Sequence, residues 1–139
     1  MADRWEHFAH EADMGIRAFA ATKASAYAQA ALAMTAVITD PDLVLPSMPV
    51  NIRCEAPDDE LLLADWLNAL VFEMATRDML FSRFEVAIDD HFLSATAWGE
   101  AVDRKRHHPA VEVKAATYTE LDVSQLADGT FRVQCVLDV

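Results

Sequence analysis

His10-Glu11-Ala12-Asp13-Met14-Gly15 lies between two apolar patches and combines a carboxylate with a nearby glycine. The chain ends at Leu137-Asp138-Val139, directly after an apolar stretch that is typical of a strand. If these two segments meet in space, the side chains of Asp13 and Asp138 converge with the α-carboxylate of Val139. Oxygen donors without a neighbouring cysteine suit Ca²⁺, Mg²⁺ or Mn²⁺ better than zinc, so the convergence predicts a divalent-metal site.

Each of these carboxylates also has an ordinary explanation. An aspartate just before a glycine, such as Asp13 before Gly15, is typical of a turn. Asp138 is penultimate, where a solvated side chain is common. The alternation of the last strand places Asp138 on the same face as Gln134 and opposite Leu137, so we do not expect it in the core.

Composition narrows the class of protein. The chain has 139 residues, 53% of them hydrophobic, with three glycines and five prolines, which predicts one folded domain over residues 1–139. The formal net charge is −12. Such a chain repels a phosphate backbone, so we expect no stable direct binding of nucleic acid. A basic protein partner or a bound cation fits the charge better, although solubility alone also explains it.

The N-terminal segment, the apolar runs and the cysteines indicate the cellular location that we expect. No basic start followed by an apolar run is present, and the longest mainly apolar run, 26–38, is too short to span a bilayer. We therefore expect no membrane association. Cys54 and Cys135 form no Cys-x-x-Cys motif and are typical of reduced thiols in a cytoplasmic protein, while a disulfide between them stays open.

The first half of the chain predicts strands and two helices. Strands are expected at 5–10, as an edge strand, and at 16–21. Thr22 is a suitable N-cap for a helix that should end near Thr39, because the residue before Pro41 disfavours helical backbone. Residues 41–49 form a connector, and 50–55 alternate as a half-buried strand. Acidic residues at 58–60 then open a second helix.

The second half is strand-like. Residues 84–89 and 92–101 predict a hairpin around a tight turn at 89–91, and 103–109 a polar loop. Residues 111–123 are a long strand candidate, and a turn at 127–129 leads into the strand 131–138. Two main helices and about seven strands predict a two-layer α+β domain, with the helices packed on an antiparallel or mixed sheet.

The remaining titratable residues give no enzyme signature. His7 and His10 face opposite sides of a strand, and His107 and His108 are expected in a solvated loop. Lys114 should lie on an exposed face, where it could neutralise carboxylates or reach a phosphate group. Phosphate-binding glycine motifs and a nucleophile elbow are absent, so we expect no catalytic activity.

The ordered set of motifs resembles the archease family over nearly the whole chain. The hexapeptide that begins at His10 resembles the family's His-x-Ala-Asp-x-Gly motif. Further matches follow in order: the helix ending Ile38-Thr39-Asp40, then Leu62-Leu63-Ala64-Asp65-Trp66-Leu67-Asn68, Phe84-Glu85-Val86, Glu112-Val113-Lys114-Ala115-Ala116-Thr117-Tyr118 and Leu137-Asp138-Val139. The chain departs from the family pattern at Ala110, Val111 and Thr119, which leaves the carboxylates intact.

The resemblance implies a fold and a role. The fold would be an α+β domain related to strand-helix-strand-strand modules. The role would be that of an accessory protein to the GTP-dependent RNA-splicing ligase in tRNA splicing, promoting ligase guanylylation and multiple turnover. The family binds a divalent cation, typically calcium, and its ligands correspond to Asp13, Asp138 and Val139. Lys114 matches a lysine implicated in the same activity.

Three other functions stay open at the level of sequence. A general chaperone-like module would act on unrelated clients without metal. A small-molecule-binding α+β domain would show an apolar pocket between helices and sheet. A metal-dependent hydrolase would need a base or nucleophile, and none is recognisable.

Overall fold

The computed structural model describes residues 3–139 and has an α+β fold, which confirms the predicted class. Two long helices, one short helix, one 3₁₀ turn and eight strands alternate along this part of the chain. The elements are β1 (Arg4–His10), β2 (Asp13–Ala20), α1 (Lys23–Ile38), η1 (Pro41–Leu43), β3 (Met48–Glu55), α2 (Asp59–Arg77), β4 (Met79–Asp89), β5 (Phe92–Ala101), α3 (Arg104–His107), β6 (Ala115–Ala116), β7 (Asp122–Gln125) and β8 (Phe131–Asp138).

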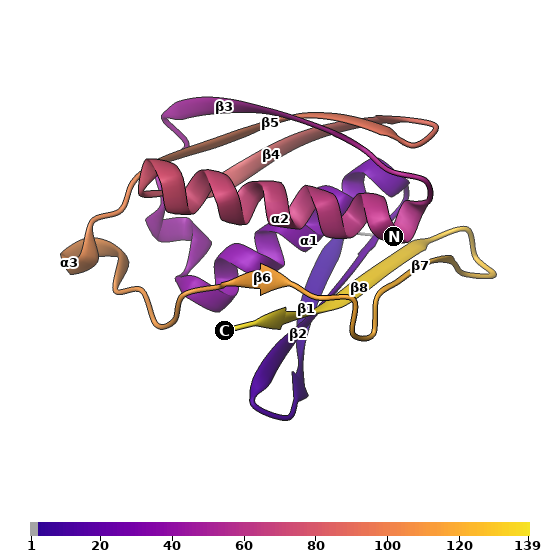
Figure 1. Ribbon diagram of the computed structural model, residues 1–139, viewed down its shortest axis with the longest axis horizontal. Helices are drawn as coiled ribbons and strands as arrows, with labels where there is room; N and C mark the ends of the chain where they lie inside the picture. The colour runs from indigo at the N-terminus through magenta and orange to yellow at the C-terminus, as the bar shows by residue number, and fades with distance from the viewer. Residues whose placement is uncertain (1–2) are drawn as a thin grey trace.

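The strands form two antiparallel sheets rather than the single sheet that was predicted. Sheet A has the order β1-β2-β8-β6, with β7 also paired to β8, and sheet B has the order β3-β5-β4. Helices α1 and α2 lie between the two sheets (Figure 1). The expectation of two layers was therefore wrong. Helix α1 is rich in alanine, and its small buried side chains let β2 and β4 approach it from opposite sides.

The two long helices begin side by side. Lys23 at the start of α1 forms an ion pair with Asp59 at the start of α2 (2.9 Å), and the Trp66 indole donates to the Tyr27 carbonyl (3.0 Å). Thr22 caps α1 by accepting from the Ser25 N–H, which confirms the predicted helix start. Fully buried side chains of α2 fix this helix in the core, among them Leu62, Leu63, Trp66 and Leu67.

Most local predictions from sequence pattern are confirmed. The edge strand β1, the helix end at Thr39, the alternating β3 and the β4–β5 hairpin all form. The tight turn of that hairpin contains Asp90 with φ 55°, and Gly129 with φ 90° lies in the predicted turn before β8. Each of these features depends on residues close together in sequence.

The expected long strand over residues 111–123 is wrong. Residues 111–114 have no regular structure, β6 contains two residues, and β7 begins only at Asp122. Both short strands pair with the same edge of β8, so the predicted strand is interrupted rather than absent. The interruption follows from Glu120, whose φ of 56° is incompatible with an extended strand.

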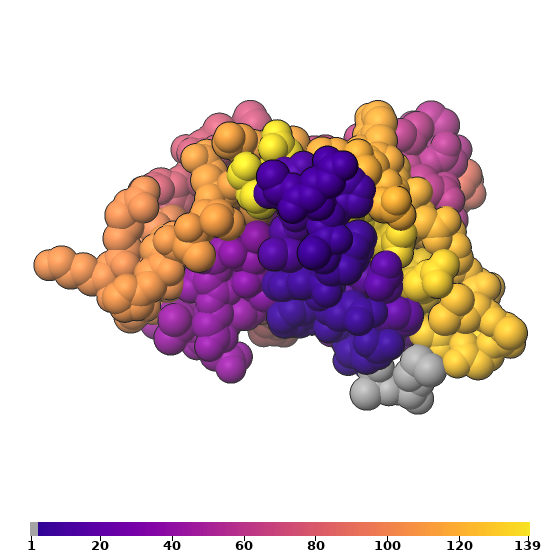
Figure 2. Space-filling view, turned by 90° about the horizontal axis from the view of Figure 1, so that it is seen from below, coloured from indigo at the N-terminus to yellow at the C-terminus, as the bar shows by residue number. Residues whose placement is uncertain are grey.

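Pairing of β2 with β8 brings the turn of the β1–β2 hairpin beside the end of β8 in sheet A. In the view of the outer face of this sheet, the yellow C-terminal residues lie beside the indigo β1–β2 hairpin (Figure 2). The buried hydrophobic residues form one cluster that includes both helices and both sheets. Within residues 3–139, no helix has the length and apolar character needed to cross a membrane.

Candidate functional site

Asp13 and Asp138 lie on neighbouring strands at one end of sheet A. Met14 of β2 pairs with Leu137 of β8, and the same register continued by one residue sets Asp13 opposite Asp138. Directly opposed residues in antiparallel strands have their side chains on the same face of the sheet. Leu137 is fully buried toward the helices, so the two carboxylates face outward, and both side chains are half-buried.

Lys114 and Val139 lie next to this pair. Ala115 pairs with Asp138, and Lys114 and Val139 are the residues that adjoin this pair on the two strands. The Lys114 N–H donates to the Asp138 carbonyl at 2.8 Å. The Val139 side chain packs against the core, which holds the chain end in place, while Lys114 is exposed. All four residues predicted from sequence are therefore neighbours in the structure.

The carboxylates of this site have no polar partners elsewhere in residues 3–139. Neither the Asp13 nor the Asp138 side chain forms a hydrogen bond or an ion pair there, and Lys114 makes no ion pair. No group of three or more His, Cys, Asp or Glu side chains in this range is suited to hold a metal ion. A metal site here therefore requires a further donor, and the α-carboxylate of Val139 is the one we predicted.

His10 lies opposite Asp13 in the β1–β2 hairpin, on the outward face, but does not complete such a group. His7 points to the other side of β1, where its Nε2 contacts the Ala33 carbonyl of α1 at 2.9 Å. The expectation that the two histidines face opposite sides of a strand is correct. His7 fastens the edge strand to the helix layer.

Gly15 keeps the outer face next to Asp13 closely packed. A Cβ atom added at Gly15 would lie 2.3 Å from atoms of the Phe8 ring, so the ring lies directly over the glycine. The neighbouring Val136 shares this outward face but is only 1% exposed. The glycine of the hexapeptide therefore lets Phe8 cover the sheet beside the carboxylates, and this packing supports their position.

Two open grooves lie away from this site. One, of about 520 Å³, lies between the start of α1 and strands β4 and β5. The other, of about 490 Å³, has mainly apolar residues from the ends of α1 and α2 and from residues 109–113. None of Asp13, Lys114, Asp138 or Val139 lines either groove.

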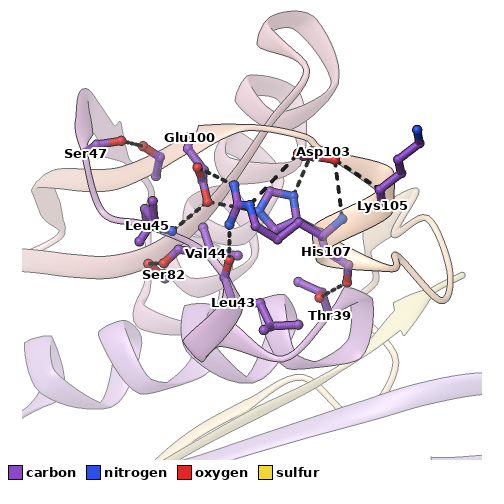
Figure 3. Close-up of polar contacts among 12 residues, drawn as sticks. Thr39, Leu43, Val44, Leu45, Ser47, Ser82, Glu100, Asp103, Lys105 and His107 are labelled. Atoms are coloured by element: carbon purple, nitrogen blue, oxygen red, sulfur yellow. Dashed lines mark hydrogen bonds and ion pairs between the residues drawn. The ribbon is translucent and has the colours of Figure 1, made fainter.

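A polar network that sequence reasoning missed joins α3 to β5 (Figure 3). The side chain of His107 is fully buried, so the expectation of a solvated loop was wrong for this residue. Its Nδ1 accepts from the Asp103 N–H (2.9 Å), and its Nε2 therefore carries the proton that it donates to Glu100 (3.0 Å). Thr39 at the end of α1 donates to the His107 carbonyl.

Glu100 is the centre of this network. Its carboxylate accepts from Arg106 (2.6 Å) and from the Leu45 N–H (2.8 Å) in addition to His107. The hydrogen bond from Arg106, with smaller contributions from Leu45 and His107, lowers the pKa of Glu100 to about 2. The network fastens the connector after α1, the end of β5 and α3 together. It thereby fixes the start of the segment that leads to Lys114.

Only part of this network left a signal in the sequence. Asp103 is the N-cap of α3, where its carboxylate accepts from the N–H groups of Lys105 and Arg106. An aspartate before a basic run is therefore a helix-start signal that the sequence contains. The pairing of His107 with Glu100 depends on the chain reversal between them, which residue types alone do not reveal.

Replacing Glu100 by glutamine is expected to lower the free energy of unfolding at pH 7 by about 1–3 kcal/mol, because a charged acceptor of three hydrogen bonds is lost. The pKa of this carboxyl falls from 4.5 in the unfolded chain to about 2 in the fold. Its stabilising contribution is therefore complete above pH 4.5 and disappears as the pH falls toward 2.

Urea unfolding of the wild type and the Glu100→Gln variant at pH 7, 4.5 and 2.5 measures this difference. Glu85→Gln is the matched control, since Glu85 forms an exposed ion pair with Arg83 and its loss should cost less than about 1 kcal/mol. A difference between wild type and Glu100→Gln that stays constant down to pH 2.5 would contradict the assigned protonation.

Comparison with known proteins identifies relatives over the full length. The sequence profile of the archease protein family matches residues 5–139. The protein archease of Pyrococcus furiosus is 34% identical over 140 residues, covering 98% of this chain and 99% of the relative. That of Methanopyrus kandleri is 37% identical over 139 residues, covering 97% and 99%.

Solved structures agree with the fold. The solution structure of protein 1598 of Methanobacterium thermoautotrophicum superposes with a TM-score of 0.84 at 34% identity, covering 97% of this chain and 98% of the other. An archease of Thermotoga maritima, described as a possible chaperone, superposes with a TM-score of 0.57 at 14% identity, covering 95% and 94%. This second comparison supports the fold alone.

Proposed function

Because the chain belongs to the archease protein family, we propose that it is a non-catalytic accessory factor of the GTP-dependent RNA-splicing ligase. In this role it promotes ligase guanylylation and repeated turnover in tRNA splicing. The observation that carries the proposal is the meeting of Asp13, Asp138, Val139 and Lys114 at one end of sheet A. The free thiols of Cys54 and Cys135 are compatible with a cytoplasmic location.

Asp13, Asp138 and the α-carboxylate of Val139 would hold a divalent cation in this proposal. Their donors are all oxygen, which suits Ca²⁺, with Mg²⁺ and Mn²⁺ as alternatives. The two side chains are free of protein partners in the part of the chain that the structure describes, so binding would break no existing contact. When bound, the cation would supply positive charge that neutralises the opposed carboxylates and attracts further oxygen ligands.

Three protein donors leave the coordination of such a cation incomplete. Calcium takes about six to eight oxygen ligands, and an exposed site with three carboxylates leaves room for water or for groups of a partner. An outward-facing site of this kind suits a cation that is shared with, or delivered to, a second protein. This geometry supports an accessory role better than a buried structural ion.

Lys114 supplies a charge of opposite sign beside the carboxylates. Its side chain is exposed and forms no ion pair within residues 3–139, so it is available to a phosphate group or to acidic residues of the ligase. A lysine beside the chain end also limits repulsion among the carboxylates when no cation is bound. We assign Lys114 to partner or phosphate contact rather than to metal binding.

The charge of the whole chain directs it toward protein rather than RNA. A net charge of −12 attracts a basic, RNA-binding ligase over distances of about a Debye length and repels free RNA. Electrostatic attraction of this type raises the rate of association and falls with ionic strength. Stimulation of the ligase should therefore weaken as salt is raised.

The test measures guanylylation and multiple-turnover ligation by the cognate ligase with and without this chain. We expect faster guanylylation and repeated turnover with the wild type, and loss of both effects after the chain is stripped of divalent ions and assayed with limiting metal. An active ligase that gains nothing from the chain would contradict the proposal. Suppressed aggregation of unrelated proteins without metal would instead favour a general chaperone.

A further inference from the structure

We infer that Asn68 of α2 is a positioning residue that holds Lys114 against the end of β8. The link from Asn68 to activity rests on the proposed function, whereas its role in holding β6 does not. Asn68 lies in neither the carboxylate cluster nor the segment that carries Lys114. It acts on that segment through the backbone of Ala116, two residues after the lysine.

The side chain of Asn68 forms two hydrogen bonds with one residue of β6. Its Oδ1 accepts from the Ala116 N–H at 2.8 Å, and its Nδ2 donates to the Ala116 carbonyl at 3.0 Å. The amide therefore satisfies both backbone groups of Ala116, as a neighbouring strand would. Of the common side chains, an amide is the one that offers a donor and an acceptor in this spacing while remaining neutral.

Strand β6 needs such a partner because it is very short. It contains only Ala115 and Ala116, which pair with Asp138 and Leu137 of β8 on one side. On the other side no strand of sheet A follows within residues 3–139. Ala116 is 4% exposed, so without Asn68 its N–H and carbonyl would be buried and unpaired at considerable cost.

Asn68 is itself fixed by the core. Its neighbours Leu67 and Leu70 on α2 are 0% and 1% exposed, and α2 lies between the two sheets. The helix therefore gives β6 an anchor that is independent of β8. The segment is held between this anchor and the end of β8, where the Lys114 N–H bonds to the Asp138 carbonyl.

This arrangement links α2 to the proposed site. The residues before Lys114, from 109 to 113, have no regular structure, so the pairing of β6 and the bond from the Lys114 N–H to Asp138 are the sheet contacts that orient the lysine. Losing the Asn68 amide would free one side of a two-residue strand. Lys114 would then sample more positions relative to Asp138 and Val139, and the site would be formed only part of the time.

The variant Asn68→Asp tests this inference at nearly unchanged shape. At pH 7 the carboxylate still accepts from the Ala116 N–H but cannot donate to its carbonyl. We expect the amides of Lys114 and Ala116 to exchange with deuterium roughly tenfold faster than in the wild type. Asn51→Asp is the matched control, because Asn51 is exposed on β3 and acts as an acceptor from Thr96.

Acidic pH separates a lost donor from general damage. A protonated aspartate regains one donor while keeping one acceptor, so near pH 3, below the usual pKa of about 3.9 for an aspartate, the exchange ratio of the variant to the wild type should return toward one. Unchanged exchange at pH 7, or a ratio that does not respond to pH, would overturn the assigned role of the amide.

A double-mutant cycle tests the link to function. If Asn68 acts through Lys114, Asn68→Asp should reduce ligase stimulation roughly tenfold in an otherwise wild-type chain. The same substitution should have little further effect in a chain that already carries Lys114→Ala. Faster exchange with unchanged stimulation, or fully additive losses, would overturn the functional role while leaving the proposed function intact. Failure of the wild type itself to stimulate the ligase would overturn both.

Discussion

Replacing Gly99 by alanine is expected to lower the free energy of unfolding by about 3 kcal/mol or more, a large share of the total stability of a domain of this size. Gly99 lies in β5, the central strand of sheet B, between β3 and β4. A Cβ atom there would lie 1.8 Å from the carbonyl oxygen of Leu80 and 2.8 Å from the Cα of Phe81. Both are backbone atoms, so no side chain can rotate away.

The clash arises from an irregularity in the neighbouring strand. The β4–β5 register shifts between Phe81 and Arg83, which brings the Leu80 carbonyl over the position of Gly99. Phe81 is also held by its carbonyl, which accepts from Thr35 of α1 at 2.7 Å. Relief of the clash would therefore separate β4 from β5 and disturb the packing of α1 as well.

Thermal unfolding followed by circular dichroism measures this effect, and we expect the midpoint to fall by about 10 °C or more. Gly129→Ala is the control: Gly129 has φ 90° and no atom within 4 Å of an added Cβ, so only backbone strain of about 1 kcal/mol applies. Equal losses for the two variants would show that the contact with Leu80 does not determine stability.

Sequence pattern predicted the parts of this fold that depend on neighbouring residues. The cap at Thr22, the alternation of β3 and the turn at Asp90 each combine a residue type with a local conformation that it favours. The division into two sheets was not predictable in this way. It depends on the small side chains of α1, which allow a sheet to pack on each side of the helix. Alanine-rich helices also occur in folds where the helix covers only one sheet, so the composition alone does not distinguish the two cases.

The residues of the candidate site could be predicted from the sequence, but the residues that hold them in place could not. Asp13, Asp138, Val139 and Lys114 were chosen from the ends of the chain and from the family resemblance, and the register of β2, β8 and β6 brings them together. Their role in binding metal stays a prediction. No role for Asn68 and no pairing of Glu100 with His107 was predicted, because in each case the partner lies on a different element.

Replacing Asp138 by alanine is expected to abolish stimulation of the ligase and, at the same time, to stabilise the metal-free chain slightly. Asp138 and Asp13 are opposed like charges on adjacent strands, a pairing that costs roughly 0.2–1 kcal/mol. Removing one of them relieves this repulsion and removes a proposed metal ligand. Loss of activity with gain of stability distinguishes a functional carboxylate from a structural one.

Asp89→Ala is the matched control for charge. Asp89 is exposed on β4 in sheet B, so its removal changes the net charge by the same amount far from the site. We expect normal stimulation by this variant. If Asp89→Ala loses as much activity as Asp138→Ala, the overall acidic field accounts for the effect and the carboxylate site does not.

Extension of the chain beyond Val139 tests the same metal site independently of Asp138. Residues added after Val139 would convert its α-carboxylate into a peptide carbonyl and leave both aspartates in place. Calcium should raise the unfolding midpoint of the wild type by mass action, but much less so for the extended chain and for Asp138→Ala. An extended chain that gains as much stability from calcium as the wild type would exclude the terminal carboxylate as a ligand. The remaining donors would then be two opposed aspartates, too few to hold the cation without a partner.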